Sequence, residues 1–536
     1  MRLKSFLLCV VVFLVVPFCQ AQGAVEILCR VIDLQNKYPV SYATIQFNNS
    51  TTGVIANEEG SFRLPGDFKT SKASIKISSI GYETKDVNVG TLSYKKINII
   101  YLKPKVEALS TVVIEARSKN ARPQMSVENI IRSAIGRIPT NYPDSPHSYI
   151  SYYRDYQMVN NSYFNVNEAI IENFDAGFGT NKLRFKDNQT AMYSYKLNND
   201  FYRDTLLLNT IYGKSKVLDP SNKAKLGTDI RNELEILNIH NPIRNFKTSS
   251  FSFIYVLRDN FLLNHNFKLV KVQYIEDTPL YEIDLFSKED PSYKYRGVGK
   301  IFVSKDNFAI HKLEYRLVPN SSYIKNGSRP GSLGNRTNKN NNEALFEVTI
   351  EYKEIANEMY LNYMTFNNKF IIQEPNPLKV EDFNFNPKDE AFYITFNKPI
   401  DEASLKRKSN FKLRYKRKKL IVKEVSLADP KTIKIETINW SAGLADDTSQ
   451  ALPEDFSYKL KRIKDVSGGE IGKANDMVGY QFRELFTQEV FQNKKPPEDL
   501  IFVIKELPMS ATKVNTAQFD LKKYWINTPL KQTEAQ

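Results

Sequence analysis

Histidine and cysteine are scarce in this sequence, and their scarcity limits the chemistry it can perform. The 536 residues include four histidines and three cysteines, Cys9, Cys19 and Cys29. The first two lie in an apolar N-terminal stretch, so a chain cleaved after residue 21 keeps only Cys29. A single cysteine cannot form an internal disulfide or a zinc cage. Cys29 lies in the strand-like run VEILCRVID, where we expect it to be a small core residue.

The few histidines also argue against zinc hydrolysis. A zinc carboxypeptidase uses H-x-x-E and a distant second histidine, and only His311 and Glu314 have this spacing. They lie in FAIHKLEYRL, which alternates like a strand, and residues three apart on a strand point to opposite faces. No histidine follows His311, and G-x-S-x-G is absent. We therefore expect no catalytic residue, no metal and no cofactor.

Long apolar runs are also missing, so we expect no transmembrane helix. The apolar stretch at residues 6–18 follows two basic residues and precedes Ala21, which indicates a signal peptide cleaved after that residue. Lipidation of Cys19 is an alternative, but Phe18 stands where a lipoprotein signal requires a small residue. The chain is therefore expected to be exported to the periplasm or to the outer membrane.

Acidic residues are outnumbered, 60 against 75 basic ones, which gives a formal net charge of +15 at pH 7. Loss of Arg2 and Lys4 with the signal peptide would leave +13. An exported protein rarely meets nucleic acid. We therefore expect the partner to be an envelope protein or an anionic glycan or lipid.

The sequence is rich in β-forming residues, with 30 tyrosines and 33 phenylalanines, and predicts a mainly β fold. Residues 25–104 alternate short strand-like runs with turn signals, as in a small antiparallel sandwich. Within NEEGSF, Glu58 and Glu59 suggest a metal or catalytic corner. No further ligands lie nearby, and Gly60 can adopt the positive φ of a tight turn, so we favour a structural turn.

The motifs of this first part are specific. CRVIDLQNKYPVSYATIQFNNSTTGVIANEEGSFRLP, then ISSIGYETKDVNV and LSTVVIEA, together resemble the carboxypeptidase-regulatory-like domain of Bacteroidetes envelope proteins over residues 25–117. The resemblance implies a transthyretin-like β-sandwich. It does not imply a peptidase, because that domain is a non-catalytic accessory.

The middle of the chain predicts one helix and then a large sheet. SVENIIRSAIGRIP carries apolar residues at i, i+3, i+4 spacing, with Ser126 as its cap and Pro139 as its stop. Successive hairpins over residues 148–372 indicate a large, curved antiparallel sheet, interrupted by a polar loop at 320–342. The run at residues 295–317 is similar to the half-barrel of lipoprotein-carrier-like proteins, which implies an apolar ligand on the concave side.

The last third contains a second resemblance. ITFNKPID, the strand with NFKL, DPKTIKI and the closing YKLKRIKDVSG resemble a bacterial immunoglobulin-like domain over residues 376–471. Its basic run is a candidate contact for an anionic ligand through Lys416, Arg417, Lys418 and Lys419. The preceding FKLRYK alternates as a strand with one solvated face, so we favour a structural role for the run, since edge strands often carry lysine. Near the end of the chain, Tyr524 and Trp525 are expected to dock onto a neighbouring domain.

We therefore expect a non-enzymatic, exported envelope protein that acts as a binding or scaffolding module at the outer membrane. One alternative is a carrier of an apolar ligand in the middle sheet. Another is a glycan or peptide hydrolase whose carboxylates include Glu168, Glu172 and Asp175. The expected parts begin with a signal peptide (1–21), a regulatory-like sandwich (22–104) and an extra strand with linker and amphipathic helix (105–147). They continue with a β-rich middle domain (148–372), an Ig-like sandwich (376–471) and a C-terminal extension (472–536).

Overall fold

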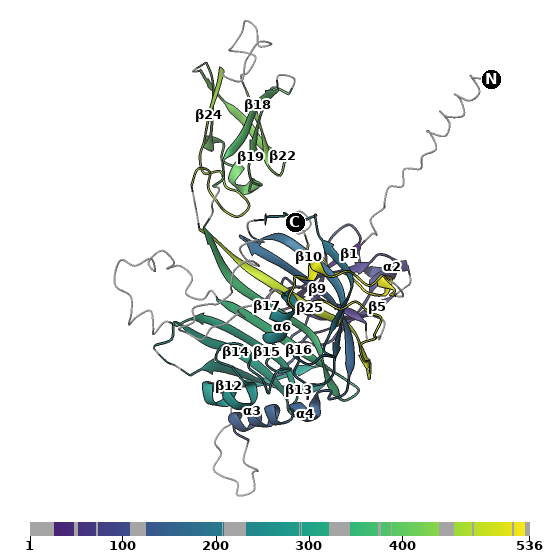
Figure 1. Ribbon diagram of the computed structural model, residues 1–536. Coiled ribbons are helices and arrows are strands. Elements are labelled where there is room, and N and C mark those ends of the chain that lie inside the picture. The colour runs from purple at the N-terminus through teal and green to yellow at the C-terminus, as the bar shows by residue number, and fades with distance from the viewer. Residues whose placement is uncertain are drawn as a thin grey trace, which may run out of the picture. The chain divides into compact units, whose positions relative to one another are not determined.

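A computed structural model describes residues 26–47, 52–70, 73–107, 125–205, 207, 232–288, 290, 292–320, 344–373, 377–386, 389–416, 418–438, 455–473, 476–516 and 519–530. The predicted signal peptide with Cys19, the strand-like LSTVVIEA, the loop at 321–342 and Arg417 lie outside these residues. The chain divides into two compact units: a smaller one with residues 1–108, 273–279 and 527–536, and a larger one with the rest. The fold is mainly β, as predicted (Figure 1).

The smaller unit is built from two sheets. Their strand orders are β4-β1-β7 and β3-β2-β5-β6. Strand β1 alternates between half-buried and buried residues, and its inward side chains are Ile27, Cys29 and Val31. The elements are β1 (Glu26–Asp33), β2 (Thr44–Phe47), β3 (Gly53–Ile55), β4 (Ser61–Pro65), α2 (Asp67–Thr70), β5 (Ser74–Ser78), β6 (Lys85–Asn88), β7 (Asn98–Leu102) and β8 (Val106–Glu107). Period-two burial places Cys29 in the core, as expected.

The NEEG segment of this unit is a turn. Gly60 has φ +69° and its amide donates to the Asn57 carbonyl at 2.9 Å. The Asn57 side chain closes the corner, because its Oδ1 accepts from the Ser61 amide at 2.7 Å. These bonds and the positive φ of Gly60 show that the segment forms the expected tight turn.

The end of the chain packs into the same unit. Asn527 donates from Nδ2 to the Ile55 carbonyl at 2.9 Å and accepts from the Arg63 amide at 3.1 Å. The Arg63 guanidinium donates to the carbonyls of Thr528 and Pro529 at 2.8 and 3.1 Å. Residues 527–530 are therefore held by backbone and side-chain hydrogen bonds to β3 and β4.

A long antiparallel sheet forms the larger unit (Figure 1). Its strands lie in the order β11-β10-β9-β25-β17-β16-β15-β14-β13-β12. Their bounds are β9 (His147–Val159), β10 (Ser162–Asp175), β11 (Thr190–Leu197), β12 (His265–Ile275), β13 (Thr278–Ser287), β14 (Tyr295–Ser304), β15 (Ile310–Pro319), β16 (Phe346–Ile355), β17 (Glu358–Gln373) and β25 (Asp476–Gln492). The hairpin at Asn160 and Asn161 is confirmed, since both have positive φ and fit a type I′ turn.

Strand β25 corrects the predicted domain boundaries. Residues 476–492, which the sequence pattern places in a C-terminal extension, pair with β17 on one side and β9 on the other. The Ig-like sequence is therefore an insertion between two neighbouring antiparallel strands, β17 and β25. YQFRELFTQEVF alternates like a strand, but chain order alone cannot show that it pairs with residues more than 300 positions earlier.

Helices line one face of this sheet. The predicted helix is α3 (Val127–Gly136), whose Ser126 cap accepts from the Asn129 amide at 3.3 Å. Pro139 does not simply end it, because the short α4 (Ile138–Asn141) begins there and tolerates proline in its first turn. Two further helices, α6 (Glu233–Ile239) and α7 (Leu257–Asn264), were not evident from the pattern. Helix α6 contacts β17 and β25, and α3 contacts α7 and β14.

The Ig-like part is a two-sheet sandwich with orders β18-β19-β23-β22 and β21-β20-β24. Its strands are β18 (Val380–Asn386), β19 (Ala391–Phe396), β20 (Phe411–Tyr415), β21 (Lys418–Leu420), β22 (Val422–Asp429), β23 (Thr432–Thr437) and β24 (Phe456–Leu460). Strand β20 buries Phe411, Leu413 and Tyr415 and exposes Lys412 and Arg414, as the alternation predicted.

Candidate functional site

The three carboxylates named from the sequence all lie on β10, but they do not form one site. The pairing of β10 with β9 is regular from Asn167 to Asp175, so Glu168 and Glu172 share one face and Asp175 lies on the other. Glu168 accepts from the hydroxyl of Tyr152 at 2.6 Å and from Asn198 at 2.7 Å.

Glu172 is engaged in the same way. It accepts from the hydroxyls of Ser148 and Tyr193 at 2.5 and 2.7 Å, and Lys494 Nζ lies 2.7 Å from its Oε1. Both glutamates are about 1% exposed. Their carboxylates stabilise the packing between β9, β10 and β11.

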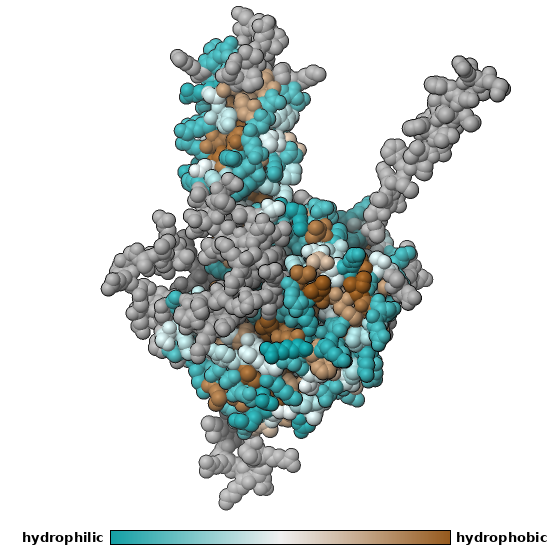
Figure 2. Space-filling view, in the orientation of Figure 1, coloured by the Kyte–Doolittle hydropathy of each residue, from teal (hydrophilic) through white to brown (hydrophobic). Residues whose placement is uncertain are grey.

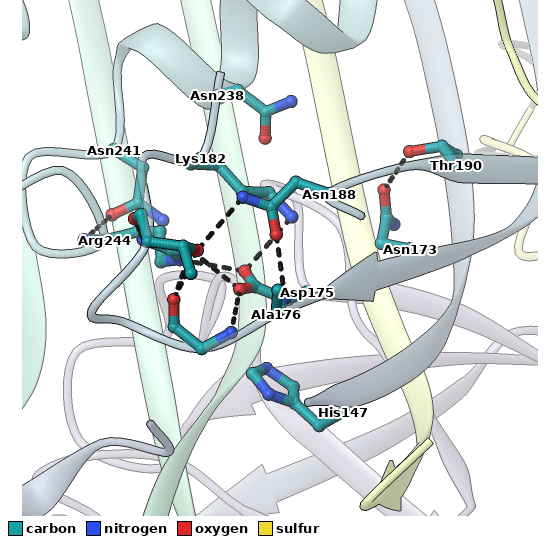
Figure 3. A network of polar contacts seen from close by, with 12 residues as sticks. His147, Asn173, Asp175, Ala176, Lys182, Asn188, Thr190, Asn238, Asn241 and Arg244 are labelled. Carbon is teal, nitrogen blue, oxygen red and sulfur yellow. Dashed lines mark hydrogen bonds and ion pairs between the residues drawn. The ribbon is translucent and has the colours of Figure 1, made fainter. Parts of the chain in front are cut away.

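Asp175 ends β10 and is the centre of a buried ionic network (Figure 3). Arg244 binds it through two parallel bonds, Nε to Oδ2 at 2.8 Å and Nη2 to Oδ1 at 2.7 Å. Lys182 Nζ lies 3.1 Å from Oδ2, and the Gly177 amide donates to Oδ1 at 3.0 Å. The three charged side chains are at most 6% exposed. One carboxylate therefore holds two cations in the interior of the larger unit.

The loop after β10 is shaped to reach this network. Gly177 has φ +103°, and a Cβ there would collide with the Asp144 backbone, so only glycine fits. The carbonyls of Gly177 and Thr180 accept from Arg244 at 2.8 and 2.9 Å. Asn188 fixes the start of the loop, because its Oδ1 accepts from the Ala176 amide at 2.8 Å.

Aromatic side chains form the support under Arg244. Its guanidinium lies 5.0 Å from the centre of the Phe178 ring, which packs against Tyr142 at 4.7 Å. The Arg244 amide donates to Asn241, whose Nδ2 donates to the Tyr352 hydroxyl at 3.0 Å. The guanidinium is thus fixed by rings, carbonyls and a carboxylate together.

A small cavity of about 30 Å³ adjoins this network. Its polar lining comes from His147, Tyr149, Asp175, Lys182, Asn238, Asn241 and Arg244. Its apolar lining comes from Phe178, Leu237, Tyr352, Met359, Tyr360, Leu361, Met364 and Leu485. The cavity therefore combines charge with an apolar wall.

The charges act on one another inside this site. Burial alone would raise the pKa of Asp175, but Lys182 and Arg244 hold it well below its usual range. Burial lowers the pKa of Lys182, and Asp175 offsets part of that effect. Burial also lowers the pKa of His147, whose Nδ1 donates to the Ser145 carbonyl at 3.1 Å. His147 is thereby held in its neutral form at pH 7.

The other sequence candidates lie apart from this network. His311 lies on β15 and is buried. Glu314 pairs with Lys312 at 2.9 Å, and these two side chains share the face of the strand opposite to His311. Among the described residues, no group of three or more His, Cys, Asp or Glu side chains is placed to hold a metal ion. Nor does any helix among them have the length and apolar character needed to cross a membrane.

The basic run of the Ig-like part is solvent-facing. Lys418 and Lys419 are exposed on β21, at the edge of its sheet, and Lys416 Nζ lies 3.8 Å from Asp455. Arg417 lies outside the described residues. This placement is compatible with both interpretations of the run, as an edge-strand device or as a contact for an anionic ligand.

Comparison with known proteins identifies one part of the chain. Residues 29–114 match the model of the CarboxypepD_reg-like domain. The chain carries such a domain. The match confirms the resemblance inferred from the V-x-D, P-V-x-x-A and S-I-G-Y motifs. A search of curated proteins gives no match.

Solved structures with local likeness come from three bacteria. A LolA superfamily protein from Nitrosomonas europaea is 12% identical and covers 46% of this chain and 86% of its own, with a TM-score of 0.19. A DUF1329 family protein from Desulfovibrio piger is 11% identical and covers 46% of this chain and 87% of its own, with a TM-score of 0.20. A putative outer membrane lipoprotein-sorting protein domain from Vibrio parahaemolyticus is 8% identical and covers 45% of this chain and 84% of its own, with a TM-score of 0.20.

The residues that build the site were largely missed from the sequence. Asp175 was named, but as a possible hydrolytic carboxylate. Its partners Lys182 and Arg244 lie 7 and 69 positions further along the chain, in segments without a recognisable motif. No local pattern reports such a pairing, because the fold alone brings the three together.

Proposed function

We propose that this chain is a non-catalytic binding module of the cell envelope, exported by its signal peptide to the periplasm or the outer membrane. The CarboxypepD_reg-like domain supports this proposal, because its resemblance is to an accessory domain rather than to a peptidase. The inserted Ig-like sandwich adds a second module of a type often found in extracellular spacers and adhesins. The ligand or partner would be an envelope protein or an anionic glycan or lipid.

The observation that carries the proposal is the engagement of the three candidate carboxylates. A glycosidase needs two carboxyl groups facing each other across a substrate at a defined separation. Here Glu168 and Glu172 are buried in hydrogen bonds on one face, and Asp175 is ion-paired on the other. Such an arrangement stabilises structure and favours binding over hydrolysis.

The carrier alternative is less well supported. The face of the sheet that would be concave is lined by α3, α6 and α7, and its apolar side chains form one continuous core. The cavity described there, about 30 Å³, has room for two or three water molecules, since each needs roughly 10–15 Å³ of such volume. This cavity is too small for an acyl chain.

In-cell cross-linking tests the proposal. The described surface facing the viewer in Figure 2 is mostly hydrophilic, with separate apolar patches, so single exposed apolar positions suit a photo-reactive residue. Tyr38, Leu263 and Ile438 are 72%, 65% and 54% exposed and sample the first domain, helix α7 of the larger unit and the Ig-like part. The exposed Asp277, which does not lie on the same helix as Leu263, is the polar control position.

The expected result is one dominant envelope protein captured from one of the three positions and not from the control. Capture of nothing proteinaceous, with the chain correctly exported, would shift the proposal to a glycan or lipid ligand. Turnover of envelope glycan or peptide by the purified chain, lost in Glu172→Gln or Asp175→Asn, would overturn the non-catalytic proposal.

A further inference from the structure

The cavity beside Asp175 has an unbalanced charge. Among the charged side chains that line it, Lys182 and Arg244 are positive and only Asp175 is negative. Glu235 acts on Lys182 from the adjoining pocket, where Lys505 in turn acts on Glu235. A buried charge without a counter-charge is costly. Among the side chains that line the cavity, the positive charges therefore outnumber the negative ones by one when Lys182 is protonated.

The cavity also presents donors that the protein does not use. The Arg244 guanidinium donates to Asp175, Gly177 and Thr180. The Lys182 ammonium has three N–H groups and, within the described structure, a single acceptor in Asp175. The Tyr149 side chain is 7% exposed and lines the same cavity, and its hydroxyl has no hydrogen-bond partner in the described residues. Both residues line the cavity, and the Lys182 Nζ lies 5.9 Å from the centre of the Tyr149 ring.

His147 adds a group that responds to charge. Its Nδ1 donates to the Ser145 carbonyl, which leaves Nε2 as the ring atom available to the cavity. Asp175 and Lys182 act on this ring in opposite directions. A negative group in the cavity would favour the protonated ring and thereby gain one more donor.

The size and walls of the cavity restrict what fits. A volume of about 30 Å³ admits a group of a few atoms. One negative charge would neutralise the excess cation, whereas a doubly charged phosphate would reverse the imbalance. The side chains of Leu237, Met359 and Leu485 provide an apolar surface beside the donors. A small carboxylate with a short apolar tail satisfies all three requirements.

We propose that the cavity between Lys182, Tyr149 and His147 is a binding site for the carboxylate group of a small ligand. This inference rests on the proposed binding function and names the ligand chemistry of one site within it. Lys182 and Tyr149 donate to the carboxylate oxygens, and Asp175 and Arg244 hold Lys182 in place without contacting the ligand.

The test uses the full mature chain and ¹³C-labelled acetate observed by saturation-transfer NMR. Formate, propionate, chloride and inorganic phosphate are then added in turn at constant ionic strength, and their competition with acetate for the site is measured. We expect saturable binding of formate and acetate, weaker binding of propionate because the cavity has room for only a few atoms, and little competition from chloride or phosphate. We also expect acetate to raise the pKa of His147, followed by its ring proton signals.

Two variants and one control locate the site. Lys182→Met keeps most of the length of the side chain and removes its ammonium group. It should weaken acetate binding at least tenfold. Tyr149→Phe removes only a hydroxyl without a partner and should weaken binding severalfold without affecting folding. Lys312→Met is the matched control, because Lys312 is another largely buried lysine paired with a carboxylate, Glu314 at 2.9 Å, and it lines neither this cavity nor the adjoining pocket. Its acetate binding should be unchanged.

Absence of saturable carboxylate binding to the wild-type chain would overturn the inference, even if Lys182→Met failed to fold. Competition by chloride as strong as that by formate would also overturn it, because the site would then bind any small anion and would not be specific for a carboxylate. Neither result would alter the cross-linking outcome, so the wider binding proposal and this site fail independently.

Discussion

Replacing Asp175 by asparagine tests whether the buried network holds the larger unit together. The substitution keeps the shape of the side chain but removes the charge that faces Arg244 at 2.7 and 2.8 Å and Lys182 at 3.1 Å. Two cations that are at most 6% exposed would then lack their counter-charge. Breaking a buried ion pair in this way costs about 3–5 kcal/mol.

Hydrogen exchange of β9 and β10 measures this cost in the region where it arises. Each 1.36 kcal/mol changes an equilibrium by tenfold, so amides that exchange through opening of these strands should speed up by about two to four decades. Peptides from the CarboxypepD_reg-like domain should keep their rates. This local reading avoids assigning one unfolding free energy to a chain of several domains.

The exposed pair of Arg258 and Asp259 is the matched control, because the same two residue types meet at 2.9 Å with about half of each side chain exposed. Asp259→Asn should leave exchange in β9 and β10 unchanged, since water screens such pairs. If Asp175→Asn changed those rates by less than tenfold, the network would not carry the stability assigned to it.

Three further predictions concern other parts of the chain. Burial raises the pKa of Cys29 to about 12, so in a chain that begins after residue 21 this thiol should resist a thiol reagent at pH 8 and react fully in urea; rapid labelling of the native chain would contradict its core placement. Burial lowers the pKa of His311 to about 4. The neutral ring therefore contributes its full stability above pH 6.5, and this contribution is lost as the pH falls towards 4. About 2 kcal/mol of the free energy of unfolding should be lost by pH 5. The urea midpoint of His311→Phe should accordingly fall less than that of the wild type between pH 7 and 5, and parallel curves would refute the assignment. Arg63→Met removes two bonds to the carbonyls of residues 528 and 529, so brief proteolysis should release the chain end faster than in Arg30→Met, whose side chain bonds Ser61 instead; equal rates would show that Arg63 does not hold the end.

Features written in neighbouring residues could be predicted from the sequence. The hairpin at Asn160 and Asn161 is local, because two residues with positive φ define its turn. Helix α3 is also local, since its buried isoleucines repeat every three or four positions behind a serine cap. The alternation in β20 likewise foretold which side chains are buried.

Features that depend on distant residues could not be predicted. Helices α6 and α7 are short, and α7 has little difference between its faces, so no periodic signal marks it. The bond network of Asp175 joins β10 to a segment 69 positions away, and only the folded chain makes that pairing. The insertion of the Ig-like part was hidden for the same reason.

The position of β25 has a consequence for how the protein reaches its folded state. Gln157 on β9 bonds to Gln481 on β25, a sequence separation of 324 residues. Until residues 476–492 are delivered, β9 and β17 each present an unpaired edge, which invites association with other chains. Pairings between distant residues also form slowly. A chain in which residues 476–492 have not yet joined the sheet would therefore be prone to aggregation, and a chaperone that covers strand edges would matter most until this strand is paired.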